Sequence, residues 1–199
     1  SSTGQPRFSS RRPTVLLPLA MPPVRPMRRC MCRRRMETVS PGGAMHSSWK
    51  PVSGGVTAPQ GFRAAGLAVG LKPSGKPDLA LLLAPEGAVC GGAFTTSVVR
   101  AACVDLCSER LESSGGRVRA ALINSGQANA CTGDRGLIDC QRATAALADR
   151  LGLDVEEVLI CSTGVIGVPI PMPTLLAGLD PLTIALADHG GEAAAQAIL

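Results

Sequence analysis

The sequence predicts a mixed α/β protein in which β-sheets and helices pack as the layers of a sandwich. Short apolar runs bounded by Gly and Pro alternate with segments whose apolar residues recur at helical spacing. The composition is 45% hydrophobic but only 2% aromatic, with one Trp and no Tyr. The expected core therefore consists of aliphatic side chains and Ala.

The positive charge belongs to an N-terminal arm. Residues 1–50 hold ten Arg or Lys residues and one acid, whereas the rest of the chain holds ten basic and fourteen acidic residues. This division excludes a uniformly basic nucleic-acid-binding domain. Residues 1–53, rich in Arg, Ser and Pro, have too little apolar surface to fold, and we expect them to be disordered.

The composition of this arm is that of an organelle transit peptide, with the chloroplast as the expected destination and the mitochondrion as the alternative. Two alternative interpretations of the arm are a secretory signal and a basic tail that binds RNA or membranes through its charge. The apolar run 15–21 is too short to span a bilayer, and Pro18 interrupts it. We therefore expect no membrane association and no nucleic-acid partner.

The folded part is expected to begin at Gly54. Two strands joined by a hairpin loop at 72–77 come first, and the second is apolar enough to be covered on both faces. A third strand, a short helix that ends at Gly115 and a fourth strand follow. The expected strands are 65–71, 78–84, 90–96 and 118–123, and the helix is 104–111.

The second half repeats a strand, a polar Gly-containing loop and a helix. The loop 124–133 precedes the clearest helix of the chain, which ends at Gly152. A strand at 158–160 then leads into the loop 161–167. The predicted apolar face of the helix is formed by Leu137, Cys140, Thr144, Leu147 and Leu151.

The C-terminal part is expected to be an extended segment followed by helices. Prolines at 169, 171 and 173 favour the extended segment. Short helices are expected at 174–179 and 181–187, and an Ala-rich helix at 192–199. This last helix reaches the final residue without a cap, which favours a truncated or cleaved polypeptide.

The stretch 160–167 organises the functional prediction. Backbone N–H groups at a strand end can face a developing negative charge, as in an oxyanion hole. Thr163 could add a hydroxyl donor, and Gly164 permits close approach of a ligand. The alternative is a local turn in which small polar residues satisfy the backbone, and the stretch alone favours this alternative. Because the loop 124–133 has the same design, the two loops can converge on one site.

A complete catalytic set is missing from the sequence. None of the common nucleophile, phosphate-loop, dinucleotide or zinc-protease motifs occurs. Glu156 and Glu157 are expected on the solvated surface, and Asp134 and Asp139 are assigned to helix-start electrostatics. Cys161 has no nearby histidine in sequence and is interpreted as a packed thiol.

The eight cysteines include no Cys-x-x-Cys pair, so no metal site is predicted and reduced thiols are expected. Oxyanion donors are therefore present without an activated nucleophile, and the natural inference is half of an active site.

Four ordered motifs resemble the ornithine acetyltransferase family, the bifunctional glutamate N-acetyltransferases of arginine biosynthesis. The resemblance covers 54–199 and includes 55–62, 92–96, 124–133 and 161–167. It implies an N-terminal-nucleophile-like acyltransferase made as a precursor that cleaves itself into α and β chains.

In this family a threonine freed at the β N-terminus carries the acetyl group, and its own amine acts as the base. The resemblance implies acetyl transfer from N-acetylornithine, or from acetyl-CoA as an alternative donor, to glutamate. It further implies an α2β2 assembly, no cofactor and no metal. The Thr-Gly oxyanion pair of the family matches Thr163 and Gly164.

The sequence departs from the family pattern because it ends before the cleavage junction and the nucleophilic threonine. The chain is therefore expected to be an α-chain portion that is inactive alone. Two other interpretations stay open: an inactive truncated fragment or noncatalytic partner, and a related self-processing aminopeptidase.

Overall fold

A computed structural model describes residues 51–199. The predicted disorder and transit function of the arm concern residues that, apart from 51–53, lie outside the described residues. The boundary at residue 53 stays a prediction. Among the helices of residues 51–199, none is long and apolar enough to cross a membrane.

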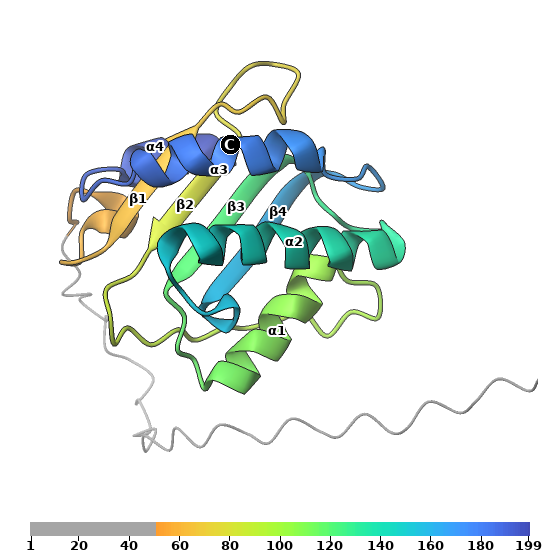
Figure 1. Ribbon diagram of the computed structural model, residues 1–199, viewed down its shortest axis with the longest axis horizontal. Coiled ribbons are helices and arrows are strands. Elements are labelled where there is room, and N and C mark those ends of the chain that lie inside the picture. Colours follow the sequence, from red (N-terminus) through yellow and green to blue (C-terminus); the bar gives the residue numbers. More distant parts are fainter. Residues whose placement is uncertain (1–50) are drawn as a thin grey trace, which may run out of the picture. The chain divides into compact units, whose positions relative to one another are not determined.

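The described part is built on a four-stranded mixed sheet, with strands in the order β1-β2-β3-β4 (Figure 1). The pairs β1–β2 and β2–β3 are antiparallel, whereas β3 and β4 are parallel. The strands are β1 (Arg63–Leu67), β2 (Leu79–Leu83), β3 (Ala120–Gln127) and β4 (Val158–Val165). The helices are α1 (Ala102–Ser114), α2 (Gly133–Leu151), α3 (Met172–Ile184) and α4 (Gly191–Ile198). Short 3-10 turns lie at Gly55–Thr57 and Val155–Glu157.

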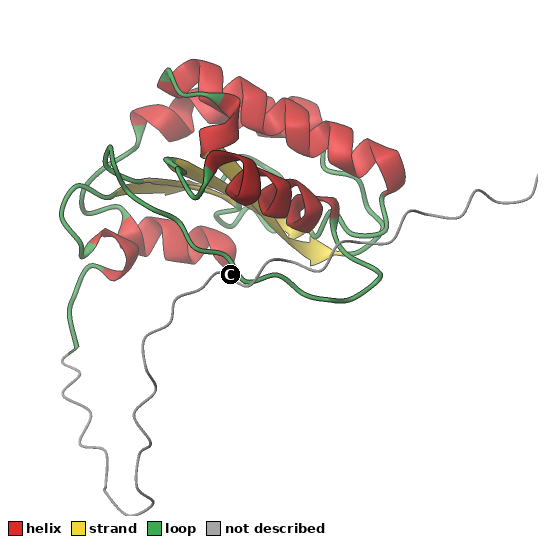
Figure 2. Ribbon diagram, turned by 90° about the horizontal axis from the view of Figure 1, so that it is seen from below, coloured by secondary structure: helices red, strands yellow, loops and turns green. Residues whose placement is uncertain are grey.

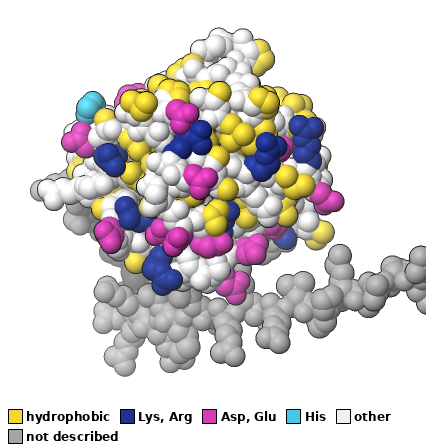
Figure 3. All heavy atoms as spheres, viewed as in Figure 1, with side chains coloured by type: hydrophobic (Ala, Val, Ile, Leu, Met, Phe, Trp, Pro, Cys, Tyr) yellow, Lys and Arg dark blue, Asp and Glu magenta, His cyan; other side chains and the backbone are white. Residues whose placement is uncertain are grey.

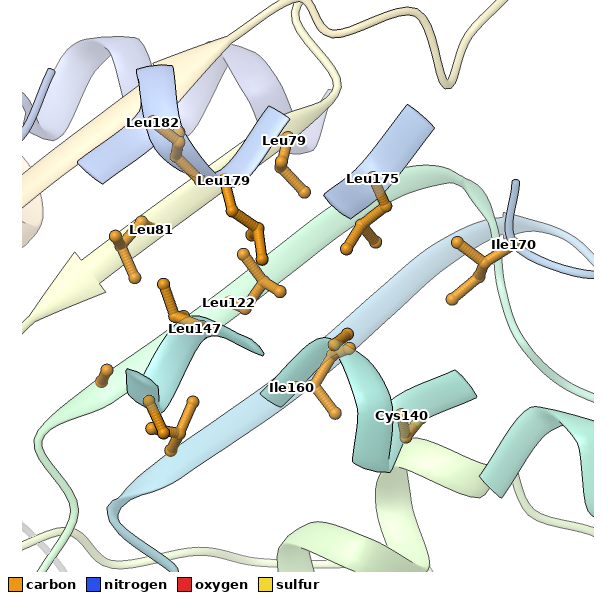
Figure 4. Close-up of a cluster of buried hydrophobic side chains, with 14 of the residues drawn as sticks. Leu79, Leu81, Leu122, Cys140, Leu147, Ile160, Ile170, Leu175, Leu179 and Leu182 are labelled. Carbon is orange, nitrogen blue, oxygen red and sulfur yellow. The ribbon is translucent and has the colours of Figure 1, made fainter. Parts of the chain in front are cut away.

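Helices lie on both faces of this sheet (Figure 2). The helices α2 and α3 cover the face that carries Leu79, Leu122 and Ile160, all fully buried (Figure 4). On the opposite face a small cluster of alanines joins α4 to β1 and β2. The predicted mixed α/β class and aliphatic core are confirmed. Residues 51–199 form one sheet, and the sandwich of several sheets stays a prediction.

Helix α1 covers the outer edge of β4. The Cys107 thiol donates to the Ile160 carbonyl over 3.1 Å, and the Arg110 guanidinium donates to the Val158 carbonyl. Burial lowers the pKa of Arg110. These contacts satisfy carbonyls that an edge strand would otherwise leave open to pairing with another chain.

Charged and apolar side chains are mixed on the face of the described part that Figure 3 shows. Lys and Arg side chains there lie among Asp and Glu side chains. Ion pairs of the described part include Arg150 with Asp180 at 2.6 Å and Arg100 with Asp105 at 2.6 Å.

The strand predicted at 90–96 is wrong. This segment has no regular secondary structure, and its backbone bond from Cys90 N–H to the Gly116 carbonyl belongs to a loop. Both sheet edges are occupied elsewhere, by α1 along β4 and by a bridge from Ala187 to Ala64 on β1. Two consecutive glycines also weaken the strand tendency of 90–96.

One helix, α3, replaces the two short helices predicted at 174–179 and 181–187, and it begins at Met172, inside the segment predicted to be extended. Pro173 is the second residue of α3, where the missing N–H costs nothing. Pro181 lies inside the helix, which nevertheless continues. The fully buried Leu175, Leu179 and Leu182 pack α3 into the core, and this packing outweighs the lost hydrogen bond.

The helix predicted before Gly152 is confirmed as α2. The face of α2 that is buried differs in part from the predicted apolar face. Cys140, Thr144 and Leu147 are fully buried, whereas Leu137 is 38% exposed. Gly136 and Ala143 take the inner positions instead. Small residues allow α2 to lie close to its neighbours, which a pattern of large side chains does not reveal.

Candidate active site

The two predicted loops are continuations of strands. Residues 124–127 belong to β3 and residues 161–165 belong to β4, so the predicted strand ends at 123 and 160 are wrong. Their convergence is confirmed, because the parallel register pairs Ser125 with Thr163 and Gly126 with Gly164. The sheet itself, rather than a flexible turn, holds these residues.

A buried hydrogen-bond network supports this strand pair. The Ser162 hydroxyl donates to the Asn124 side-chain carbonyl over 2.6 Å, and the Asn124 amide donates to the Gln127 backbone carbonyl over 3.0 Å. Asn124 is fully buried. Buried polar groups that are paired in this way fix one local geometry, since each lost bond would leave an unsatisfied group.

Gly126 and Gly164 touch through their backbones. Their φ angles are 115° and 134°, a region that residues with side chains rarely adopt. A Cβ on Gly164 would lie 2.7 Å from the Gln127 nitrogen and closer still to the Gly126 carbonyl group. Glycine is therefore required at residue 164 for both conformation and space.

Thr163 and Gly164 are both exposed. Along β4, Thr163 shares a sheet face with Leu159, because alternate side chains point to the same face. This face is opposite the one that α2 and α3 cover. The Val158 and Ile160 carbonyls point to the outer edge, where α1 binds them, and the same alternation directs the Gly164 N–H to that edge. An exposed threonine and an exposed glycine are therefore adjacent at the end of β4.

The loop 128–132 lies beside this end. Asn129 and Cys131 are the non-glycine residues of the described part with positive φ, at 49° and 57°. The buried Asn129 side chain donates to the Gly136 carbonyl over 2.9 Å and accepts from the Thr132 hydroxyl over 2.8 Å. Sequence reasoning placed this loop at the site but missed Asn129 as the residue that joins it to α2.

Cys161 is exposed, so its prediction as a packed thiol is wrong. Its side chain lies on the open sheet face, which residues 51–199 cover only in part. The surrounding protein still raises the pKa of the Cys161 thiol to about 11 by desolvation, and the neighbouring thiols add to this shift. A thiol that is protonated at neutral pH is not an activated nucleophile.

The four acidic residues considered in the sequence analysis lie in or beside helices and turns. Asp134 lies in the first turn of α2 as predicted, but Asp139 is buried further along the helix, 3.5 Å from Arg135. Glu156 is exposed, and Glu157 forms a capping box with Asp154. Within residues 51–199 no group of three or more His, Cys, Asp or Glu residues is placed to hold a metal ion.

The arrangement defines an α/β protein in which the exposed Thr163 and Gly164 lie where two parallel strands end. Comparison with known proteins gives its family: a model of the ArgJ family matches residues 63–199. The chain belongs to the ArgJ family.

The chain is 77% identical over 164 residues to the arginine biosynthesis bifunctional protein ArgJ of Parasynechococcus marenigrum (strain WH8102), covering 82% of this chain and 40% of that protein. It is 72% identical over 156 residues to ArgJ of Prochlorococcus marinus (strain MIT 9313), covering 78% of this chain and 36% of that protein. The chain therefore spans about two fifths of the length of these relatives.

Two solved structures share the fold. The Mycobacterium tuberculosis ornithine acetyltransferase, solved in complex with ornithine, matches with a TM-score of 0.69 and 43% identity, over 72% of this chain and 78% of that chain. The Bacillus halodurans ArgJ protein matches with a TM-score of 0.68 and 33% identity, over 73% and 75%.

Proposed function

We propose that this chain is the α-chain portion of a glutamate N-acetyltransferase that moves an acetyl group from N-acetylornithine to glutamate in arginine biosynthesis. The observation that carries the proposal is the exposed Thr163–Gly164 pair, which the backbone contact with Gly126 holds in place. Membership of the ArgJ family supports acetyl transfer over the aminopeptidase alternative. The ornithine bound to the Mycobacterium tuberculosis relative supports the choice of substrate.

In the proposed mechanism a threonine of the remaining segment attacks the acetyl carbonyl of N-acetylornithine. The hydroxyl proton passes to the amine of that threonine, and the carbonyl oxygen becomes an oxyanion. Thr163 Oγ–H and Gly164 N–H donate to this oxygen. Collapse of the intermediate breaks the C–N bond, the amine returns the proton to the leaving ornithine, and an acetyl-threonine ester remains. Attack by the glutamate amine then reverses these steps.

The role of this chain is electrostatic. The two donors are fixed before the reaction, so little reorganisation is needed when the negative charge develops. Neither a cofactor nor a metal takes part in these steps. Acetyl-CoA is the alternative donor for the first half-reaction.

A β chain from the same precursor is the proposed partner. An apolar groove of about 340 Å³ lies on the open sheet face, lined by residues that include Phe62, Leu82, Val118 and Leu159. About three fifths of the length of the relatives lies outside the part matched here. We propose that this remaining segment covers the groove, brings the nucleophile to Thr163, and assembles as α2β2.

The test is Thr163→Val in the complete enzyme, which removes the hydroxyl and keeps the branched shape. We expect acetyl transfer to glutamate to fall by roughly two to three orders of magnitude, the usual cost of one oxyanion donor. Thr163→Ser retains the hydroxyl and should stay close to wild type. Thr183→Val removes a hydroxyl from α3 and is the matched control.

Assays with N-acetylornithine, acetyl-CoA and peptide amides identify the acyl donor. Unchanged transfer in Thr163→Val would overturn the assigned role, and turnover of peptide amides alone would favour the aminopeptidase. Coexpression of the chain with the remaining segment tests the other alternative, because an inactive fragment would gain no activity.

The chloroplast destination of residues 1–53 is also a proposal, supported by their Arg- and Ser-rich composition. A fluorescent protein fused behind these residues should enter chloroplasts. Its accumulation in mitochondria or in the cytosol would contradict the proposal.

A further inference from the structure

Asp78 is a fully buried carboxylate immediately before β2. Its two oxygens accept four backbone N–H groups from four consecutive residues of the β1–β2 loop. The donors are Val69 at 2.8 Å, Gly70 at 3.1 Å, Leu71 at 2.6 Å and Lys72 at 2.9 Å. Charge-assisted bonds of this kind offset the cost of burying the carboxylate and fix the loop backbone.

The backbone of Asp78 ties the same loop to the sheet. Its N–H donates to the Leu67 carbonyl over 2.9 Å, and its carbonyl accepts from the Ser125 N–H over 2.8 Å. Asp78 therefore connects the end of β1, the loop 68–77 and the part of β3 that pairs with Thr163. In Figure 1 this loop extends beyond the sheet at the end where β3 and β4 finish.

The loop in turn supports the glycine pair. The Gln127 side-chain amide donates to the Leu71 carbonyl over 2.9 Å. A Cβ on Gly126 would lie 3.2 Å from this carbonyl oxygen and 3.4 Å from Lys72 Cγ. The loop thus lies directly against Gly126, which lies against Gly164.

We propose that Asp78 is a positioning residue for the Thr163–Gly164 donor pair, acting through the loop 68–77 and Gly126. The proposal rests on the proposed function of that pair. A carboxylate suits this task because both of its oxygens accept hydrogen bonds, whereas an Asn side chain has one acceptor and would turn an NH₂ group toward backbone donors. Release of the loop would let Ser125 and Gly126 move, and with them the Thr163 hydroxyl and the Gly164 N–H of the paired strand.

The first experiment compares Asp78→Asn with wild type in the complete enzyme, under conditions where both are folded. We expect kcat to fall about 10- to 100-fold with little change in KM, because a displacement of about 1 Å costs about that much when the lost interaction belongs to the transition state. Asp180→Asn, which removes an exposed carboxylate on α3, should leave kcat unchanged. A loss of folded protein with normal kcat in the folded fraction would overturn the proposal.

Gln127→Met is the second variant, since it breaks the bond to the Leu71 carbonyl but leaves Asp78 intact. It should lower kcat in the same direction, and it keeps the proposal testable if Asp78→Asn does not fold. Unchanged kcat in Gln127→Met would mean that the loop does not act through Gly126.

A double-mutant cycle with Thr163→Val separates positioning from general destabilisation. If Asp78 acts through the donor pair, its substitution should cost much less once the Thr163 hydroxyl is gone. Independent, multiplicative losses would contradict the proposal.

Amide hydrogen exchange gives a readout that does not depend on acetyl transfer. Asp78→Asn should speed exchange at the loop amides and at 126, but not at the α2 amides. Faster local exchange in an enzyme whose Thr163→Val variant is fully active would refute the proposed function and leave the structural link intact. Unchanged exchange at 126 would refute the link itself.

Discussion

We expect Gly164→Ala to destabilise the protein, because Gly164 lies against the backbone of Gly126 at the candidate site. The new Cβ would have to fit 2.7 Å from the Gln127 nitrogen and even closer to the Gly126 carbonyl group, at a φ of 134°. The backbone strain costs about 1 to 3 kcal/mol, and over-packing of a rigid contact costs about 1 to 3 kcal/mol more. Together these make about 2 to 6 kcal/mol, a large share of the roughly 5 to 15 kcal/mol that stabilises a domain.

Two other glycines of the chain separate these costs. Gly167 has a φ of 79° with no atom within 4 Å of an added Cβ, so Gly167→Ala should show the strain alone. Gly91 has open space and no positive φ, so Gly91→Ala should change stability by less than about 0.5 kcal/mol. In denaturant unfolding of the complete enzyme, we expect the loss of stability to be largest in Gly164→Ala, smaller in Gly167→Ala and smallest in Gly91→Ala. Acetyl transfer is measured in parallel. Wild-type stability and activity in Gly164→Ala would refute the close backbone contact.

Further predictions concern the edge of the sheet and the thiols. Arg110→Ala should destabilise the protein by about 1 to 3 kcal/mol, because the Val158 carbonyl loses its donor; Arg117→Ala, at an exposed residue, should have little effect in the same unfolding assay. Burial raises the pKa of the Cys140 thiol to about 12. At pH 8 that thiol stays protonated, so mass-mapped alkylation of the native protein should label the exposed Cys131 first. Equal labelling of both would contradict the burial of Cys140.

The sequence carried enough information to place β1, β2 and α2 in order and to pair two polar segments, because each rests on local periodicity or on Gly and Pro. The strand predicted at 65–71 nevertheless ends at Leu67, because Asp78 binds the N–H groups of residues 69–72 in a loop. It did not show that 161–165 stays in the sheet. Strand propensity is low for Ser-Thr-Gly, and only the partner β3 extends the strand through Gly164.

Asp78 illustrates a different limit. In the sequence it is one acid before an apolar run, and its four backbone partners become visible only when the loop folds back. The same holds for α3. Its leucines pack against residues that are distant in the sequence, and this packing keeps the chain helical past Pro181. Tertiary packing decided both cases, and local pattern does not encode it.

The central claim is that Thr163 and Gly164 stabilise the charge formed during acetyl transfer. The most direct measurement is the rate at which the complete enzyme becomes acetylated by N-acetylornithine in a single turnover, followed by intact mass. Wild type should gain one acetyl group on the segment that completes the enzyme, and Thr163→Val should gain it two to three orders of magnitude more slowly. Equal acetylation rates in the two proteins would contradict the claim.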